Sequence, residues 1–331
     1  MYDLISKNKR KSWLVFFGMG ILLLGMGAAI GALVDPEPQS GMGIMQGIII
    51  ATIVWGVQAL IALLGGAKVV LAGMDAHPIT QQDDPMLYNI IEELTLSTGL
   101  PMPKIYIINS YASNAFAAGT KPSQSVVAIT RGLREKLNRQ EIQAVMAHEM
   151  SHIYNRDVMY MTFASVMLCT IVLISQIAMR SFLWGGGKSR SNNNGKGGNG
   201  AAQLVIIAVV LVLAILAPIF AQLFYFSLSR KREYLADTMA VNFTRDPNSL
   251  ADALVKISGD SEKFDPGKMA AAMCISKPKL KEGKESLFST HPPIQKRIAI
   301  LRAMSMGTDY ESYRSAYAQV MGKDDLGLKS S

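Results

Sequence analysis

Cysteine and charged residues are scarce in this chain. Only two cysteines, Cys169 and Cys274, occur among its 331 residues, which argues against a disulfide-stapled fold and against a cysteine-based zinc site. Charged residues make up only 18% of the sequence, while apolar residues make up 50%, and this charged share is below that of a typical soluble domain. No internal repeat is present. Part of the chain is therefore expected to lie away from water.

Charge is absent altogether from four long segments. None of these segments contains Asp, Glu, Lys or Arg: 13–34, 44–67, 158–179 and 204–226. A helix crosses the hydrocarbon core of a bilayer with about 20 apolar residues, whereas apolar runs in soluble cores have about 10–14. The sequence therefore predicts four transmembrane helices, and Pro218 predicts a kink in the fourth. The first is expected to be an uncleaved anchor, because its apolar part is too long for a signal peptide.

The basic residues around these segments predict their orientation. The stretch KNKRK (7–11) precedes the first segment, whereas the connector 35–43 has two acidic residues and no basic one. Cytoplasmic flanks carry the excess of Lys and Arg. The N-terminus (1–12) and the domain after the second span are therefore expected in the cytoplasm, beneath a cell (inner) membrane that the chain crosses several times.

The second pair of segments leaves an alternative open. The linker 180–203 is basic and rich in Gly, Asn and Ser, although a third crossing would place it outside. Either the first helix dominates the orientation, or the last two segments form a hairpin that does not fully cross. Within the linker, 185–200 is of low complexity and predicts a flexible loop. The net charge of +8 is explained by contacts with anionic lipid headgroups, so no nucleic-acid partner is predicted.

The second hairpin divides the remaining polar domain into two pieces, 68–157 and 227–331. Asp84 and Gly99 predict the two ends of a helix. Four apolar residues fall on one face of this helix: Leu87, Ile90, Ile91 and Leu94. The short β-rich runs 104–109 and 125–130 predict a small sheet. The sequence therefore predicts a membrane-anchored α+β fold that is mainly helical.

Half of the four histidines lie together in the stretch EIQAVMAHEMSHIYNRD. Asn138, followed by Glu141, forms a capping-box pattern that predicts the start of a helix. At 3.6 residues per turn, His148 and His152 project from one face of this helix, so both rings can reach one metal ion. Glu149 is rotated by about 100° and can instead reach a water molecule beside that ion. This HExxH pattern predicts two zinc ligands and a general base.

A catalytic zinc site needs a third protein ligand, and HExxH supplies two. The extended motif is absent, because Val158 stands where its third histidine would lie. The segment SRKREYLADTMAVNF (229–243) offers Glu233 and Asp237, which are four residues apart and share a helix face. Glu233 is predicted to bind the metal, and Asp237 to accept the N–H of a ligand histidine. Asp157 is either a second such acceptor or a simple helix-end carboxylate.

Four segments in this order resemble the HtpX-type membrane-bound zinc metalloproteases and, more distantly, the prenyl-protein proteases of the same family. They are SNAFAAGT (113–120), HEMSH (148–152), REYLAD (232–237) and STHPPIQKRI (289–298). The resemblance covers nearly the whole chain. It implies a zincin-type, gluzincin-like catalytic domain with one zinc ion per chain on His148, His152 and Glu233. It also implies that Glu149 is the catalytic base.

Two further roles come from this resemblance. It implies that His291 lies over the site and helps to stabilise the oxyanion, although the residue alone fits a helix-start histidine equally well. It also implies that an edge strand with Asn114, Ala115 and Phe116 lines the substrate cleft, where the sequence alone predicts a turn. His77 has no partner at ligand spacing and is interpreted as structural.

The resemblance implies an endopeptidase that cuts membrane or misfolded proteins on the cytoplasmic side, in protein quality control or a stress response. Three alternative functions compete with this one. Polar residues around the motif argue against an intramembrane zinc protease. A prenyl-protein (CAAX-type) processing protease would need an enclosed chamber built from more than four spans. A non-catalytic membrane scaffold would leave the histidines without metal. No oligomeric state is predicted.

Overall fold

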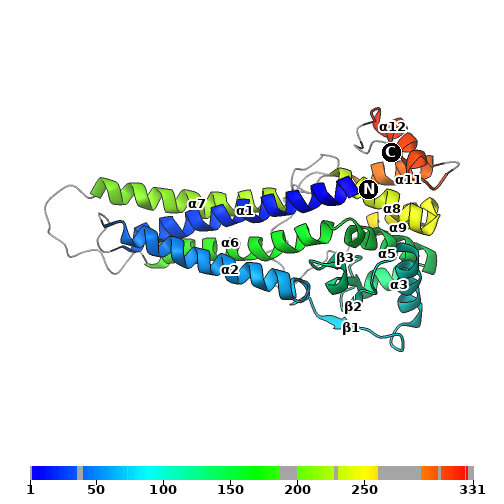
Figure 1. Cartoon of the computed structure of the whole chain (residues 1–331), viewed down its shortest axis with the longest axis horizontal. Helices are drawn as coiled ribbons and strands as arrows, with labels where there is room; N and C mark the ends of the chain where they lie inside the picture. The colour runs from blue at the N-terminus through cyan, green and yellow to red at the C-terminus, as the bar shows by residue number, and fades with distance from the viewer. Residues whose placement is uncertain are drawn as a thin grey trace.

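A bundle of long helices is joined at one end to a smaller domain that contains a sheet (Figure 1). This arrangement comes from a computed structural model, which describes residues 2–35, 40–72, 74–185, 200–226, 230–259, 292–304, 307–324 and 326. The charge-free segments form the bundle and the two polar pieces form the domain. α1 begins at the domain end of the bundle (Figure 1).

The bundle is built from α1 (Tyr2–Val34), α2 (Met42–Leu71), α6 (Asp157–Gly185) and α7 (Gly200–Phe226). In the described chain, three segments are helical, long and apolar enough to cross a membrane: Trp13–Val34, Met42–Leu71 and Asp157–Ile177. The apolar stretch found in α7, Ile207–Ala221, is shorter. The fourth predicted span therefore stays a prediction, as does the kink at Pro218. The basic N-terminal stretch, expected only to precede the first span, is itself part of α1.

Glycines let α1 and α2 approach each other closely. A Cβ atom on Gly31 would lie 2.0 Å from the carbonyl oxygen of Gly43, and one on Gly27 would lie 2.5 Å from that of Gly47. The turn between the helices is closed by Asp35, which accepts the N–H of Gly43 at 2.8 Å. Small residues at four-residue spacing on both helices therefore form a membrane helix contact, in which backbone packs on backbone.

α6 is the most enclosed of the three candidate spans. Residues buried inside the protein make up 69% of its most apolar window, against 22% for α2. The exposed residues of α2 are mainly isoleucine and leucine, as expected for a face that meets lipid tails. Aromatic rings join α6 to α1, since Phe163 lies 5.3 Å from Phe16 and 6.1 Å from Trp13 between ring centroids.

The domain contains a four-stranded mixed sheet in the order β1–β2–β4–β3. The strands are β1 (Ala76–Pro78), β2 (Lys104–Ile108), β3 (Ala115–Ala118) and β4 (Val126–Thr130). β2 and β4 pair in parallel, and β1 and β3 pair antiparallel at the two edges. The β-rich runs 104–109 and 125–130 thus contribute strands to a small sheet, as predicted, and these are its two central strands.

Helices pack with this sheet in one apolar core. They are α3 (Pro85–Thr98), α4 (Arg131–Lys136), α5 (Arg139–Tyr154), α8 (Arg230–Thr244), α9 (Pro247–Ser258), α11 (Ile294–Ala303) and α12 (Tyr310–Met321). Asp84 caps α3 by accepting the N–H of Leu87 at 3.0 Å. It also accepts two hydrogen bonds from Arg134, at 2.6 and 2.9 Å. Gly99 ends the helix in the left-handed conformation, and the four apolar residues of the predicted face are all buried.

The opposite face of the sheet packs against the domain end of α2. Ala67, Val70 and Leu71 of α2 share a small core with residues of β2, β3 and β4. Phe116 of β3 lies against this core. The sheet is therefore held between the helices of the domain and the membrane bundle, and this places β3 at the junction of the two.

Candidate metal centre

The helix α5 is fixed locally at its start. Asn138 accepts the N–H of Glu141 at 2.9 Å, and the carboxylate of Glu141 accepts the N–H of Asn138 at 2.8 Å. The predicted capping box is therefore confirmed. Lys256 of α9 donates to the same carboxylate at 2.7 Å. Because its first turn is held in this way, the rotation of α5 about its own axis is fixed, and so is the face that its later turns present to α8.

Three side chains from two helices meet in the interior. The ring centroids of His148 and His152 on α5 are 5.0 Å apart. α8 packs beside α5 and brings Glu233 to both rings, 3.5 Å from Nε2 of His148 and 3.7 Å from Nε2 of His152. One ligand atom from each residue lies within 4.8 Å of the others, and all three residues are buried. The structure thus joins the HExxH histidines to a carboxylate more than eighty positions later.

This donor set fits a divalent metal ion such as zinc, which takes imidazole and carboxylate ligands. Two ligand atoms at about 2.0–2.1 Å from a tetrahedral zinc are about 3.4 Å apart, close to the distances from Glu233 to the two rings. Nε2 of His148 is buried and has no hydrogen-bond partner in the described chain. A buried polar atom without a partner is unfavourable, and a metal ion would supply that partner. The three residues could therefore hold a metal ion.

His148 is backed by a buried ion pair. Its Nδ1 lies 3.0 Å from a carboxylate oxygen of Asp237, the residue predicted to accept from a ligand histidine. Asp237 is fully buried and accepts two hydrogen bonds from Arg297 of α11, at 2.8 and 2.6 Å. Sequence reasoning missed Arg297, because QKRI looks like a solvated helix face. The only local signal is its place in the STHPPIQKRI segment, and its burial depends on how α11 packs.

His152 has a parallel arrangement. Its Nδ1 lies 3.4 Å from a carboxylate oxygen of Asp157. The other carboxylate oxygen lies 3.4 Å from the guanidinium of Arg232, and both residues are buried. Of the two roles open to Asp157, the geometry favours the acceptor that orients a ligand histidine. Arg232 was also missed, since it stands in the basic run RKR that follows a predicted span.

The charges of this cluster favour protonated histidines when no metal is present. Burial lowers the pKa of His148, but its contacts with Asp237 and Glu233 outweigh burial and raise it to about 9. Burial also lowers the pKa of His152, but the contact with Asp157 and the charge of Glu233 together outweigh burial and raise it. Burial raises the pKa of Asp237, yet its contacts with Arg297 and His148 together hold it below its usual value. A metal ion that binds here must therefore displace protons.

The remaining predicted residues of the motif segments fall in different places. Glu149 is half-buried on the neighbouring face of α5, so it keeps the access to solvent that the two histidines lack. His291 lies outside the described residues. His77 lies on β1, exposed and 3.0 Å from Asp75, away from the metal cluster.

The predicted substrate segment lies at an edge of the sheet. Asn114 directly precedes β3, and its N–H and carbonyl bond the side chain and backbone of Thr130 at 3.0 and 2.9 Å. Ala115 and Phe116 begin β3, whose one strand partner in the described sheet is β4. Ala115 packs against the core shared with α5, and Phe116 packs against the core shared with α2. A turn predicted from the residues alone is therefore wrong here, and the strand implied by the resemblance is present.

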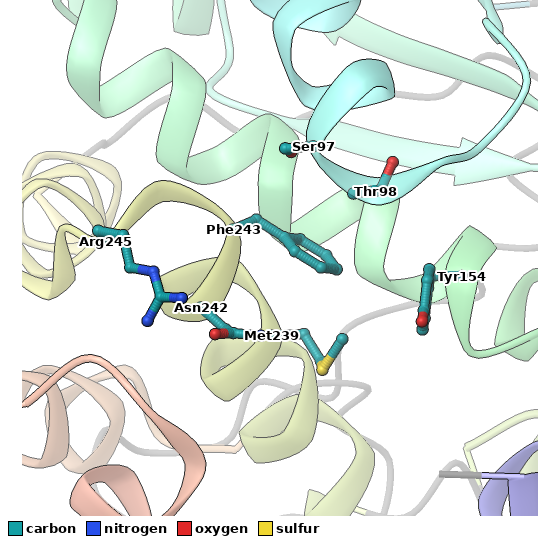
Figure 2. Close-up of a pocket in the computed structure, with 7 residues that line it drawn as sticks. All are labelled: Ser97, Thr98, Tyr154, Met239, Asn242, Phe243 and Arg245. Atoms are coloured by element: carbon teal, nitrogen blue, oxygen red, sulfur yellow. The ribbon is translucent and has the colours of Figure 1, made fainter.

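A separate pocket of about 420 Å³ lies on another side of α5 and α8 (Figure 2). It is lined by Ser97, Thr98, Tyr154, Met239, Asn242, Phe243 and Arg245. The rings of Phe243 and Tyr154 meet edge to face at 5.8 Å. None of the candidate metal ligands lines this pocket, so it is distinct from the metal centre.

Known proteins match this chain along most of its length. The profile of Peptidase family M48 matches residues 81–305. The "Protease HtpX homolog" of Listeria monocytogenes is 41% identical over 309 residues, covering 92% of this chain and all of that protein. The homologs of Listeria innocua and Ligilactobacillus salivarius are 43% and 39% identical, each over 92% of this chain and all of their own length. The crystal structure of S. mikatae Ste24p matches with a TM-score of 0.43 and 17% identity, over 91% of this chain and 67% of that one.

The family match spans both polar pieces of the chain and the hairpin between them, and the curated relatives align with it along their entire length. These similarities include the segments that carry the buried His–His–Glu cluster and the helices able to cross a membrane. The chain therefore belongs to peptidase family M48 and is a membrane-bound metalloprotease.

Proposed function

We propose that this protease is a zinc-dependent endopeptidase with one ion held by His148, His152 and Glu233. The observation that carries the proposal is the buried convergence of these three side chains, with Nε2 of His148 left without a hydrogen-bond partner in the described chain. Asp237 and Asp157 orient the two rings from behind, so that the free nitrogen of each ring faces the carboxylate of Glu233.

Glu149 is the proposed general base. Zinc, when bound, supplies Lewis acidity that acidifies water and polarises a peptide carbonyl. Glu149 is half-buried beside His148 and takes the proton from the attacking water. It then returns that proton to the nitrogen of the leaving amine as the carbon–nitrogen bond breaks. His291 remains a proposed donor to the oxyanion, on the family resemblance alone.

The edge of β3 is the proposed binding site for the peptide backbone. In the described sheet, one side of β3 pairs with β4, and its other side pairs with no strand. An extended peptide can add to such an edge through backbone hydrogen bonds, which give affinity with little selectivity for sequence. Asn114, Ala115 and Phe116 would form this edge.

We further propose that the natural substrates are membrane or misfolded proteins, cut on the cytoplasmic side of the cell (inner) membrane. The basic stretch before the first span supports this orientation. The proposed topology has four spans, with the catalytic domain in two pieces and the linker 180–203 between the last two spans. A role in protein quality control or a stress response follows from the family resemblance.

The deciding experiment compares Glu149→Gln with wild type in detergent. We expect the variant to retain its zinc and to lose cleavage of casein by a factor of about 10² or more, because the glutamine cannot accept the proton. Glu92→Gln, an exposed glutamate on α3, is the matched control and should cleave at the wild-type rate. Cleavage by Glu149→Gln at that rate would refute the assigned base, and a wild-type protein free of metal would favour a non-catalytic scaffold.

A further inference from the structure

The residue after β3 is hydrogen-bonded to the membrane bundle through one hydroxyl group of α6. Gly119, the residue after β3, donates its N–H to Oγ1 of Thr162 on α6 at 3.0 Å. The same hydroxyl donates to the carbonyl of Gly119, also at 3.0 Å. Thr162 is buried, so both backbone groups of Gly119 depend on it rather than on water. The φ of +140° at Gly119 requires glycine there.

A second attachment follows directly in the chain. Thr120 donates its hydroxyl hydrogen to the carbonyl of Leu63 on α2 at 3.2 Å. α2 and α6 meet closely at this point, since a Cβ atom on Gly66 would lie 2.4 Å from the methyl group of Thr162. Two consecutive residues after β3 are thus bonded to two different helices of the bundle.

These contacts lie at the level where the first span begins. Trp13 opens the charge-free segment after KNKRK, is exposed, and contacts Phe163, the neighbour of Thr162. Tryptophan between basic residues and an apolar span marks the membrane surface. On α2, the ring of Trp55 lies 5.0 Å from that of Phe16 and 5.8 Å from that of Phe17, and Leu63 lies about two turns beyond Trp55. The contact of Trp13 with Phe163 therefore places the end of β3 near the membrane surface.

From this placement we infer a substrate class: the protease cuts peptide segments that directly adjoin a membrane span. The inference rests on the proposed function, in which the substrate pairs with β3. β3 has four residues, a length of about 13 Å, and its Gly119 end lies at the membrane surface. A peptide paired along β3 therefore has its cleavage site within a few residues of the bilayer.

Thr162 is the positioning residue of this arrangement. It does not touch the metal cluster, but it fixes the end of β3 relative to α6, whose first residue, Asp157, contacts the ligand His152. The edge of β3 and the candidate metal centre are thus both positioned by α6. Valine at this position keeps the shape of threonine and removes the hydroxyl, which leaves the two polar groups of Gly119 without their partner.

The test measures how cleavage depends on distance from the membrane. Full-length enzyme is reconstituted in lipid vesicles with a substrate that has one transmembrane helix and one segment known to be cut in casein. A Gly/Ser spacer of about 2, 6, 12 or 24 residues separates the two. kcat/KM and metal content are measured for wild type, Thr162→Val and Thr162→Ser.

We expect kcat/KM to be highest with spacers of about six residues or fewer and to fall about eightfold by about 24, because effective concentration declines as roughly the −3/2 power of linker length beyond the optimum. Thr162→Val should keep its metal, cleave the short-spacer substrates more slowly and lose the steep dependence on spacer length. Thr162→Ser, which retains the hydroxyl, should restore both properties.

A profile that is flat or peaks with the longest spacer would overturn the inference. If Thr162→Val gave the same dependence on spacer length as wild type, the positioning role inferred for Thr162 would be wrong. Failure of the proposed function has a different signature, since no substrate in the series would then be cut in a way that depends on Glu149.

Discussion

Replacing Arg297 with methionine tests whether the buried ion pair behind His148 supports the metal centre. The substitution keeps most of the side-chain volume and removes the charge. Asp237, which is fully buried, would lose two hydrogen bonds of 2.8 and 2.6 Å and retain its contact with His148. The carboxylate would then no longer be held in place, so the orientation that it gives to the ring of His148 would be lost.

The expected magnitudes follow from this geometry. Removing one partner of a buried ion pair lowers the free energy of unfolding by about 3–5 kcal/mol. Loss of a group that orients a metal ligand weakens metal binding by about 10–100-fold. Arg297→Lys keeps the charge but replaces the two-pronged guanidinium with a single ammonium group, so its effects should be intermediate.

The same helix offers a matched control. Arg302, also on α11, pairs with Asp252 at the surface, where both side chains are exposed. Arg302→Met should change the free energy of unfolding by about 1 kcal/mol or less and leave metal binding unchanged. Zinc affinity is measured by competition with a chelator of known affinity, and stability by thermal unfolding in detergent. If Arg297→Met bound zinc as tightly as Arg302→Met, the support assigned to the ion pair would be wrong.

Two further predictions concern the bundle and the pH dependence of metal binding. Gly31→Val should destabilise the protein by about 1–3 kcal/mol or more, because its side chain would collide with the backbone of Gly43. Gly25→Val is the control, since a side chain there meets open space and should leave stability unchanged. Equal thermal unfolding of both variants in detergent would contradict the close packing of α1 on α2. The apparent affinity of the metal-free protein for zinc should rise with pH below about 9, the raised pKa of His148, by up to about tenfold per pH unit for each proton displaced. A zinc affinity that is independent of pH in this range, measured by titration in metal buffers, would show that His148 is already neutral.

The parts of the fold that the sequence predicts are those encoded by neighbouring residues. Asp84 and Gly99 delimit α3, and Asn138 with Glu141 starts α5, because each cap bonds groups only three or four positions away. The helical period then places His148 and His152 on one face. β1 was not predicted, since a three-residue strand exists only through its pairing with β2.

The site beyond the motif depends on packing that no local pattern encodes. Glu233 and Asp237 could be selected because a metal needs a third ligand and a ligand histidine needs an acceptor. Arg297 and Arg232 could not be selected in this way. Both stand in basic runs that suit a solvated surface, and their burial is decided by how α11 and α8 fold back on α5. The attachment of Gly119 to Thr162 likewise joins residues that are 43 positions apart.

The pair Asp157 and Arg232 has a consequence for handling this enzyme. Asp157 is the first residue of α6, and Arg232 lies in the first turn of α8, so the entry and the exit of the inserted hairpin meet beside His152, a proposed metal ligand. Excising the hairpin to obtain a water-soluble fragment would leave Asp157 without the helix that positions it beside His152. Detergents harsh enough to splay these helices should release the ion while the sheet is still folded. The membrane hairpin is therefore needed for the geometry of the candidate metal centre.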